Sequence, residues 1–207
     1  MMNEIATNST ARKGRWTLIA LFAVAALPIA AAYIMFFTGM GVPDHTVNKG
    51  TMLPQAVKLE HLLAGENNAF LEKIAAEKKW RILIPITGDC GKACVQNLYT
   101  TRQVHIRLSE KSVRLQRVAV NIGAAKGEEQ FQQLKLEHPL LEKITVDEVR
   151  WREWLAASGA TLDETATPYY LLMDQEGFAM MVYTAEQHGN ELLKDIKRAL
   201  KYSIDYQ

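Results

Sequence analysis

The longest uncharged run in the sequence lies near the N-terminus, and it limits most strongly how the chain can fold. From Trp16 to Phe37 there are 22 consecutive residues without Asp, Glu, Lys or Arg. As an α-helix this run would span roughly 33 Å, enough to cross a hydrocarbon core of about 30 Å. Aromatic residues stand near both ends, where they favour the membrane interface. We therefore expect one transmembrane anchor at residues 16–37.

Basic residues flank only the N-terminal side of this run. Arg12, Lys13 and Arg15 precede it, whereas residues 38–48 contain no Lys or Arg. The positive-inside rule places the N-terminus in the cytoplasm and the remainder outside it. A cleaved signal is the main alternative, but the apolar run exceeds the usual core of roughly 7–15 residues. A buried core helix is the other alternative, and it fits a basic flank less well.

The sequence divides into four segments by composition. We expect a cytoplasmic tail at 1–15, the anchor at 16–37, a Gly- and Pro-punctuated linker at 38–56 and one domain at 57–207. The whole chain has a formal net charge of +1. Because no basic excess is present, we expect no nucleic-acid partner.

Helical and extended patterns alternate along the predicted domain. The expected helices are 69–79, 91–108, 128–136, one opened by the capping-box pattern at Thr145, and one from Asn190 onward. The expected strands are 81–86, 113–120, 169–173 and 178–183. Pro85 predicts either a strand end at Ile84 or a bulge. The order strand, helix, strand, helices, hairpin, helix predicts an α/β, thioredoxin-like domain with its first two strands parallel.

The chain has two cysteines, Cys90 and Cys94, which follow the first expected strand and open the helix expected after it. At positions i and i+4 their side chains share one helical face, with Cα atoms about 6 Å apart. This spacing allows a disulfide, thiol redox chemistry or a Cu(I) site with two soft ligands. We expect Cys90 to be the more reactive sulfur, since helix N-termini stabilise thiolates. A purely structural disulfide is the alternative.

Several stretches resemble the Sco/SenC group of cytochrome c oxidase assembly proteins. They are Val47-Asn48-Lys49-Gly50-Thr51-Met52-Leu53, Lys79-Trp80, Cys90-x3-Cys94, Leu98-Tyr99, Arg102-Gln103-Val104 and Arg114-x-x-Arg117-Val118. The resemblance implies a thioredoxin-like domain in the bacterial periplasm, held to the inner membrane by a single pass. It also implies that the partners are the oxidase copper-site subunit or other assembly factors.

The chain departs from the Sco pattern where that pattern has a copper-ligand histidine. No histidine precedes Tyr170; instead Thr167-Pro168 resembles the cis-proline loop of redox thioredoxins. Pro168 is thus expected to shape a docking loop beside the cysteines. Copper remains a candidate cofactor, with Cys90 and Cys94 as its ligands and His188 as a weaker third candidate. His138 is expected at the surface.

These observations predict a protein that assists oxidase assembly by thiol–disulfide exchange or copper handling through Cys90 and Cys94. Whether it is an enzyme is left open. The alternatives are a general thiol–disulfide oxidoreductase and a scaffold without chemistry.

Overall fold

The computed structural model describes residues 4–39, 47–65, 67–87, 90–124, 127–162, 168–184, 187 and 189–205. It contains two separate units, Met1–Thr46 and Val47–Gln207. In the first unit, helix α1 spans Glu4–Thr38. Its segment Gly14–Thr38 is long and apolar enough to cross a membrane, and its side chains are exposed.

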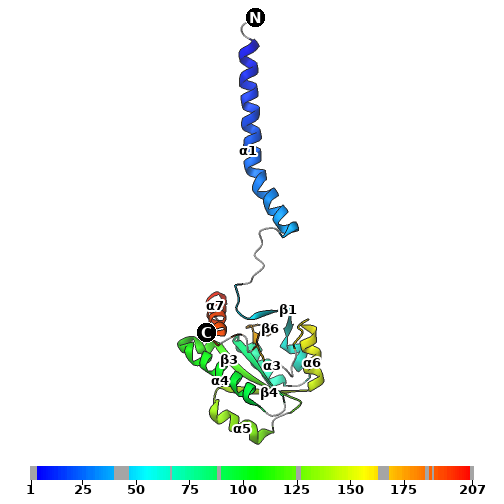
Figure 1. Ribbon diagram of the computed structural model, residues 1–207, viewed down its shortest axis with the longest axis vertical. Helices are drawn as coiled ribbons and strands as arrows, with labels where there is room; N and C mark the ends of the chain where they lie inside the picture. The colour runs from blue at the N-terminus through cyan, green and yellow to red at the C-terminus, as the bar shows by residue number, and fades with distance from the viewer. Residues whose placement is uncertain are drawn as a thin grey trace. The chain divides into compact units, whose positions relative to one another are not determined.

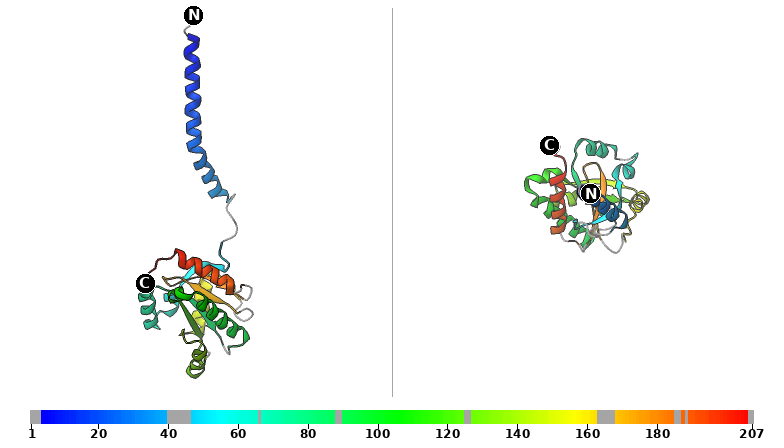
Figure 2. Two further views of the ribbon diagram at one scale, coloured as in Figure 1. Left: turned by 90° about the vertical axis from the view of Figure 1, so that its left-hand side faces the viewer. Right: turned by 90° about the horizontal axis from the view of Figure 1, so that it is seen from above.

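The second unit is built on one mixed sheet of six strands (Figures 1 and 2). The strands are β1 (Thr51–Lys58), β2 (Trp80–Ile86), β3 (Leu115–Ile122), β4 (Leu141–Val146), β5 (Tyr170–Met173) and β6 (Phe178–Tyr183), in the order β1-β6-β5-β2-β3-β4. As predicted, β2 and β3 are parallel; β3 and β4 are also parallel, while β5 and β6 form the antiparallel hairpin. The α/β, thioredoxin-like prediction is confirmed.

Helices cover both faces of the sheet. They are α2 (Leu59–Leu63), α3 (Asn68–Ala76), α4 (Lys92–Arg107), the 3-10 helix η1 (Ser109–Arg114), α5 (Glu128–Glu137), α6 (Glu148–Ala157) and α7 (Gly189–Tyr202). Leucines of α2 and the tryptophans of α6 pack on one face of the sheet. Apolar side chains of α4, α5 and α7 pack on the other face, which we call the α4/α7 face. In Figure 2, α4 (green) and α7 (red) lie side by side.

Two strands were not expected from the sequence. β1 begins at Thr51, inside the segment expected to be a linker, and pairs with β6. β4 includes Thr145, which was expected to cap a helix; the cap is Asp147, whose side chain accepts hydrogen bonds from two amides of α6. Both strands lie at sheet edges, where one partner suffices and sequence patterns are weak.

Pro85 lies within β2, so neither expectation for it was right. The parallel register with β3 runs without interruption to Ile86. On the other side, β5 pairs only with Arg81, Ile82 and Leu83. A proline lacks the N–H that a ladder requires. Pro85 is therefore tolerated because it lies beyond the part of β2 that β5 pairs with.

Candidate thiol–disulfide site

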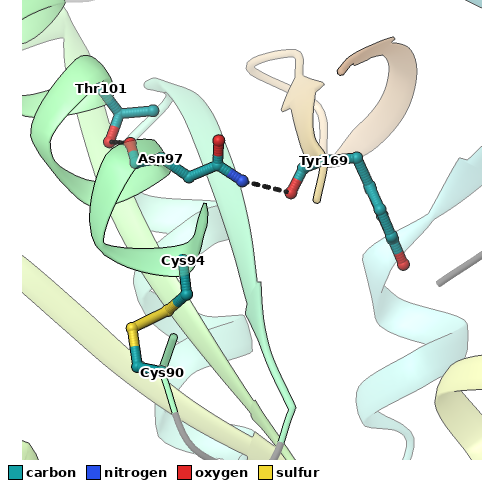
Figure 3. Close-up of a disulfide and its surroundings, with 5 residues drawn as sticks. All are labelled: Cys90, Cys94, Asn97, Thr101 and Tyr169. Carbon is teal, nitrogen blue, oxygen red and sulfur yellow. Dashed lines mark hydrogen bonds between the residues drawn. A yellow bond between two sulfur atoms is a disulfide. The ribbon is translucent and has the colours of Figure 1, made fainter. Parts of the chain in front are cut away.

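Cys90 and Cys94 form a disulfide at the carboxyl end of β2 (Figure 3). Cys90 lies just before Gly91, the N-cap of α4, and Cys94 lies in the first turn of the helix. Their Cα atoms are 5.1 Å apart, closer than the 6 Å expected for two residues of one regular helix. The separation is shorter because α4 begins at Lys92, so that Cys90 lies outside the helix.

Both cysteines are half-buried against the apolar core of the α4/α7 face. Cys90 also lines an open groove of about 510 Å³ along the outer side of α4; the other lining residues are Gly91, Lys92, Val95, Gln96 and Tyr99. Val95 and Tyr99 are 52% and 54% exposed. The Cys90 sulfur therefore belongs to an accessible, partly apolar surface.

The start of α4 favours negative charge at Cys90, whereas Asp89, its neighbour in the sequence, opposes it. The first amides of a helix have no acceptor within the helix, and the helix dipole is positive at that end. The segment from Lys92 to Arg107 contains no acidic residue. A thiolate formed at Cys90 on reduction would be stabilised by these amides and by Lys92, which is the condition for a reactive cysteine.

The segment before β5 is attached to α4 one turn beyond Cys94. Asn97 Nδ2 donates a hydrogen bond to the Tyr169 carbonyl at 3.3 Å, as Figure 3 shows. Tyr169 is buried, and its hydroxyl accepts a hydrogen bond from Trp151 Nε1. The bond from Asn97 attaches Tyr169, which Pro168 directly precedes, to the cysteine-bearing helix. The bond from Trp151 holds the Tyr169 ring in the core on the other face of the sheet. Thr167 and the peptide bond that joins it to Pro168 lie outside the described residues.

Of the cysteine and histidine ligands predicted from the sequence, only the two cysteines come together in the part of the chain that the structure describes. No group of three His, Cys, Asp or Glu side chains able to hold a metal occurs among the described residues. His188 lies outside them. His105 contacts the Leu115 carbonyl through Nε2 at 3.1 Å, near the far end of α4. His138, expected at the surface, is instead 6% exposed, because it packs where α5 meets β4.

A buried arginine beneath α4 has a role that the sequence did not suggest. Arg117 of β3 is 2% exposed. Its guanidinium donates hydrogen bonds to the Leu98 carbonyl at 2.8 Å and to Thr101 Oγ1 at 3.2 Å. Burial, together with nearby Arg102, lowers the pKa of Arg117 to about 10. Arg117 fixes α4 on the sheet and so positions the helix that carries Cys94. The signal in the sequence that could have indicated this role is an arginine inside an otherwise apolar strand pattern.

The sequence matches two models of known protein families. Residues 80–203, more than half of it, match the family model described as the transmembrane-like, thioredoxin-like, C-terminal domain. The chain belongs to this family. The companion transmembrane-like, N-terminal domain matches residues 9–39, which coincide with most of α1. The apolar helix and this match together indicate a membrane anchor. No curated protein matches the sequence.

Solved structures with a similar fold include several Sco proteins. Copper-bound ScoI of Arabidopsis thaliana has 16% identity and a TM-score of 0.50, covering 63% of this chain and 89% of that one. Yeast Sco1 has 16% identity and a TM-score of 0.50, covering 61% and 83%. BsSco has 12% identity and a TM-score of 0.51, covering 78% and 100%. The resemblance to the Sco/SenC group is thus confirmed at the level of the fold.

Proposed function

We propose that this protein is a membrane-anchored thiol–disulfide exchange protein that assists cytochrome c oxidase assembly by acting on the cysteines of the oxidase copper site. The observation that carries the proposal is the Cys90–Cys94 disulfide at the start of α4 in a Sco-like fold. BsSco, which has a similar fold, is described as having a disulfide switch and as belonging to a family of oxidase assembly proteins.

The proposed location is the bacterial inner membrane, with the domain in the periplasm. Arg12, Lys13 and Arg15 before α1's apolar segment support a cytoplasmic N-terminus. A disulfide also fits a periplasmic domain, because cytosolic reductants keep most thiols reduced. The oxidase copper-site subunit or another assembly factor is the proposed partner.

The proposed reaction is the reduction of a client disulfide by the reduced cysteine pair. The Cys90 thiolate attacks one client sulfur, breaks the client S–S bond and forms a mixed disulfide. The Cys94 thiolate then attacks Cys90, which reforms the Cys90–Cys94 disulfide and releases the second client thiolate. Two electrons pass to the client, and two protons complete its thiols. A dithiol protein returns the pair to its reduced state by the same exchange in reverse.

Two features support these roles. Cys90 lines the open groove, so its sulfur can meet a client, whereas Cys94 is one turn inside and does not line it. Pro168 adjoins Tyr169, whose carbonyl is bound by Asn97. In the proposal this segment forms the edge against which the client backbone docks.

Copper handling is the second candidate function. On reduction, Cys90 and Cys94 would offer two thiolates, and soft sulfur ligands suit Cu(I). In the disulfide state described here the same sulfurs are bonded to each other and offer no thiolate. Copper would therefore be a cargo taken up by the reduced form, with a third ligand from a partner or from His188. The copper-bound structure of Arabidopsis thaliana ScoI supports this candidate by analogy of fold alone.

A Cys94→Ser variant of the full-length protein in its membrane tests the proposal. Without the resolving sulfur, the mixed disulfide on Cys90 should accumulate, and it should contain mainly the copper-site subunit of the oxidase. The Cys90→Ser, Cys94→Ser double variant is the control and should trap nothing. Adducts with many unrelated proteins would instead indicate a general oxidoreductase. Normal copper insertion into the oxidase with the double variant would refute both the redox and the copper-handling candidates.

A further inference from the structure

A second sulfur-rich site lies away from the cysteines, between the sheet and α7. A pocket of about 320 Å³ opens there, and three methionines line it, Met52 of β1 and Met180 and Met181 of β6. Asn48, Trp80, Asp195 and Arg198 also line it. None of its lining residues belongs to the groove beside Cys90. We propose that this pocket binds Cu(I) through the three methionine thioethers.

The sheet register brings Met52 and Met181 together. They are direct partners in the antiparallel pairing of β1 with β6, so their side chains leave the same face of the sheet. Met181 is 4% exposed, whereas Met52 is 42% exposed at the mouth of the pocket. Asn48 Nδ2 donates a hydrogen bond to Met52 Sδ at 3.3 Å. The Met52 sulfur therefore lies among the polar groups of the mouth, unlike a sulfur buried in an apolar core.

A β-bulge adds the third sulfur to this face. Leu172 of β5 is opposite Met181, and the next residue, Met173, is opposite Ala179. Met180 is thus the extra residue on β6, and a bulge allows two consecutive side chains to leave one face. Accordingly, Met180 and Met181 both pack toward the α4/α7 face, while Ala179 packs toward the other face. In a regular strand, the Met180 side chain would lie on the opposite face of the sheet from Met181.

A buried carboxylate and the arginine paired with it line the same pocket. Asp195 of α7 is 3% exposed. Its Oδ2 accepts hydrogen bonds from the amides of Lys49 and Gly50 and from the Tyr183 hydroxyl. Its Oδ1 has no hydrogen-bond donor among the described residues, and Arg198 Nη1 is 3.9 Å away. The pocket therefore combines soft sulfur donors with one carboxylate oxygen that accepts no hydrogen bond, and the Arg198 guanidinium balances the charge of that carboxylate.

Cu(I) fits this combination better than other common ions. Soft thioethers select Cu(I), whereas Mg²⁺ and Ca²⁺ prefer sets of oxygen ligands. Thioethers need no deprotonation and do not form disulfides, so the site would be available in both redox states of Cys90 and Cys94. Ordinary core packing explains Met181, but it does not explain an exposed Met52 and a bulged Met180 at one pocket.

The test uses the full-length protein in detergent with Cys90→Ser and Cys94→Ser, so that no thiol can bind copper. Anaerobic titration with Cu(I), in competition with a chromophoric Cu(I) chelator, should show one equivalent retained by the protein. The ¹³C-methyl resonances of Met52, Met180 and Met181 should shift in the same titration. Changing these three methionines to Leu should abolish both signals, since Leu keeps the volume and removes the sulfur.

Met173→Leu is the matched control, because Met173 is fully buried in β5 on the other face of the sheet. It should leave the bound equivalent unchanged. Circular dichroism of each variant establishes that the fold is retained. The proposal is refuted if the cysteine-free protein retains no Cu(I), if the triple Leu variant still retains it, or if only other methionine resonances shift. Refutation here would leave the proposed role of Cys90 and Cys94 untouched.

Discussion

Reducing the Cys90–Cys94 disulfide should lower the free energy of unfolding by only about 2 kcal/mol. The bond closes a loop of five residues, since the cysteines are four positions apart. In the chain-entropy model so short a loop removes little freedom from the unfolded chain, which leads to this value of about 2 kcal/mol. Domains of this kind have total stabilities of roughly 5–15 kcal/mol. The domain should therefore remain folded with the pair reduced, as a thiol-exchange role requires.

Urea denaturation of the full-length protein in detergent, with and without a dithiol reductant, measures this difference. The fluorescence of Trp80, Trp151 and Trp154 reports on the domain, because all three are buried in its two cores. The Cys90→Ser, Cys94→Ser variant should match the reduced protein and should not respond to reductant.

The outcome separates the redox role from a structural one. A loss above about 4 kcal/mol, or unfolding on reduction, would exceed what a five-residue loop can supply. It would show that the bond organises α4 and would refute our reasoning. No loss at all would contradict the premise that the bond constrains the unfolded chain.

Three further predictions concern the frame around the site. Gly50→Ala should lower the free energy of unfolding by about 1–3 kcal/mol in urea denaturation, because a Cβ would lie 2.5 Å from the buried Tyr183 ring. The control is Lys49→Ala at the exposed neighbouring position, which should change the free energy of unfolding by no more than about 0.5 kcal/mol. Asn97→Ala should lower the free energy of unfolding by about 1 kcal/mol and speed amide hydrogen exchange in β5, because the hydrogen bond to the Tyr169 carbonyl is lost. Unchanged exchange would show that other contacts hold this segment. Burial, helped by Arg117, lowers the pKa of His138. As the pH falls, His138 is therefore protonated at a higher pH in the unfolded chain than in the folded one. The free energy of unfolding should accordingly decrease as the pH drops below about 6.5. His138→Gln should flatten this slope in denaturation series from pH 5 to 8, whereas His61→Gln at an exposed position should not.

The centre of the fold could be predicted from the sequence because its signals are local. β2, α4 and the β5–β6 hairpin carry strong apolar patterns and clear turn residues, and their ends differ from the predictions by at most one residue. The edge strands β1 and β4 were not predicted, because each has a partner on one side only and its sequence pattern is weak. The role of Arg117 was missed because its acceptors lie on α4, which a strand pattern does not reveal.

The sequence alone determined the apolar segment of α1, the α/β class of the domain and the position of the cysteine pair at the start of the helix that follows a central strand. Each of these depends on residues close together in the chain, where periodicity and spacing act directly. The tertiary structure decided which groups meet: the loop at Tyr169 with Asn97, and Met52 with the bulged Met180 and Met181. Such meetings depend on strand register and packing between distant segments, which no local pattern encodes. The sequence locates the cysteine pair, and the long-range contacts determine what surrounds it.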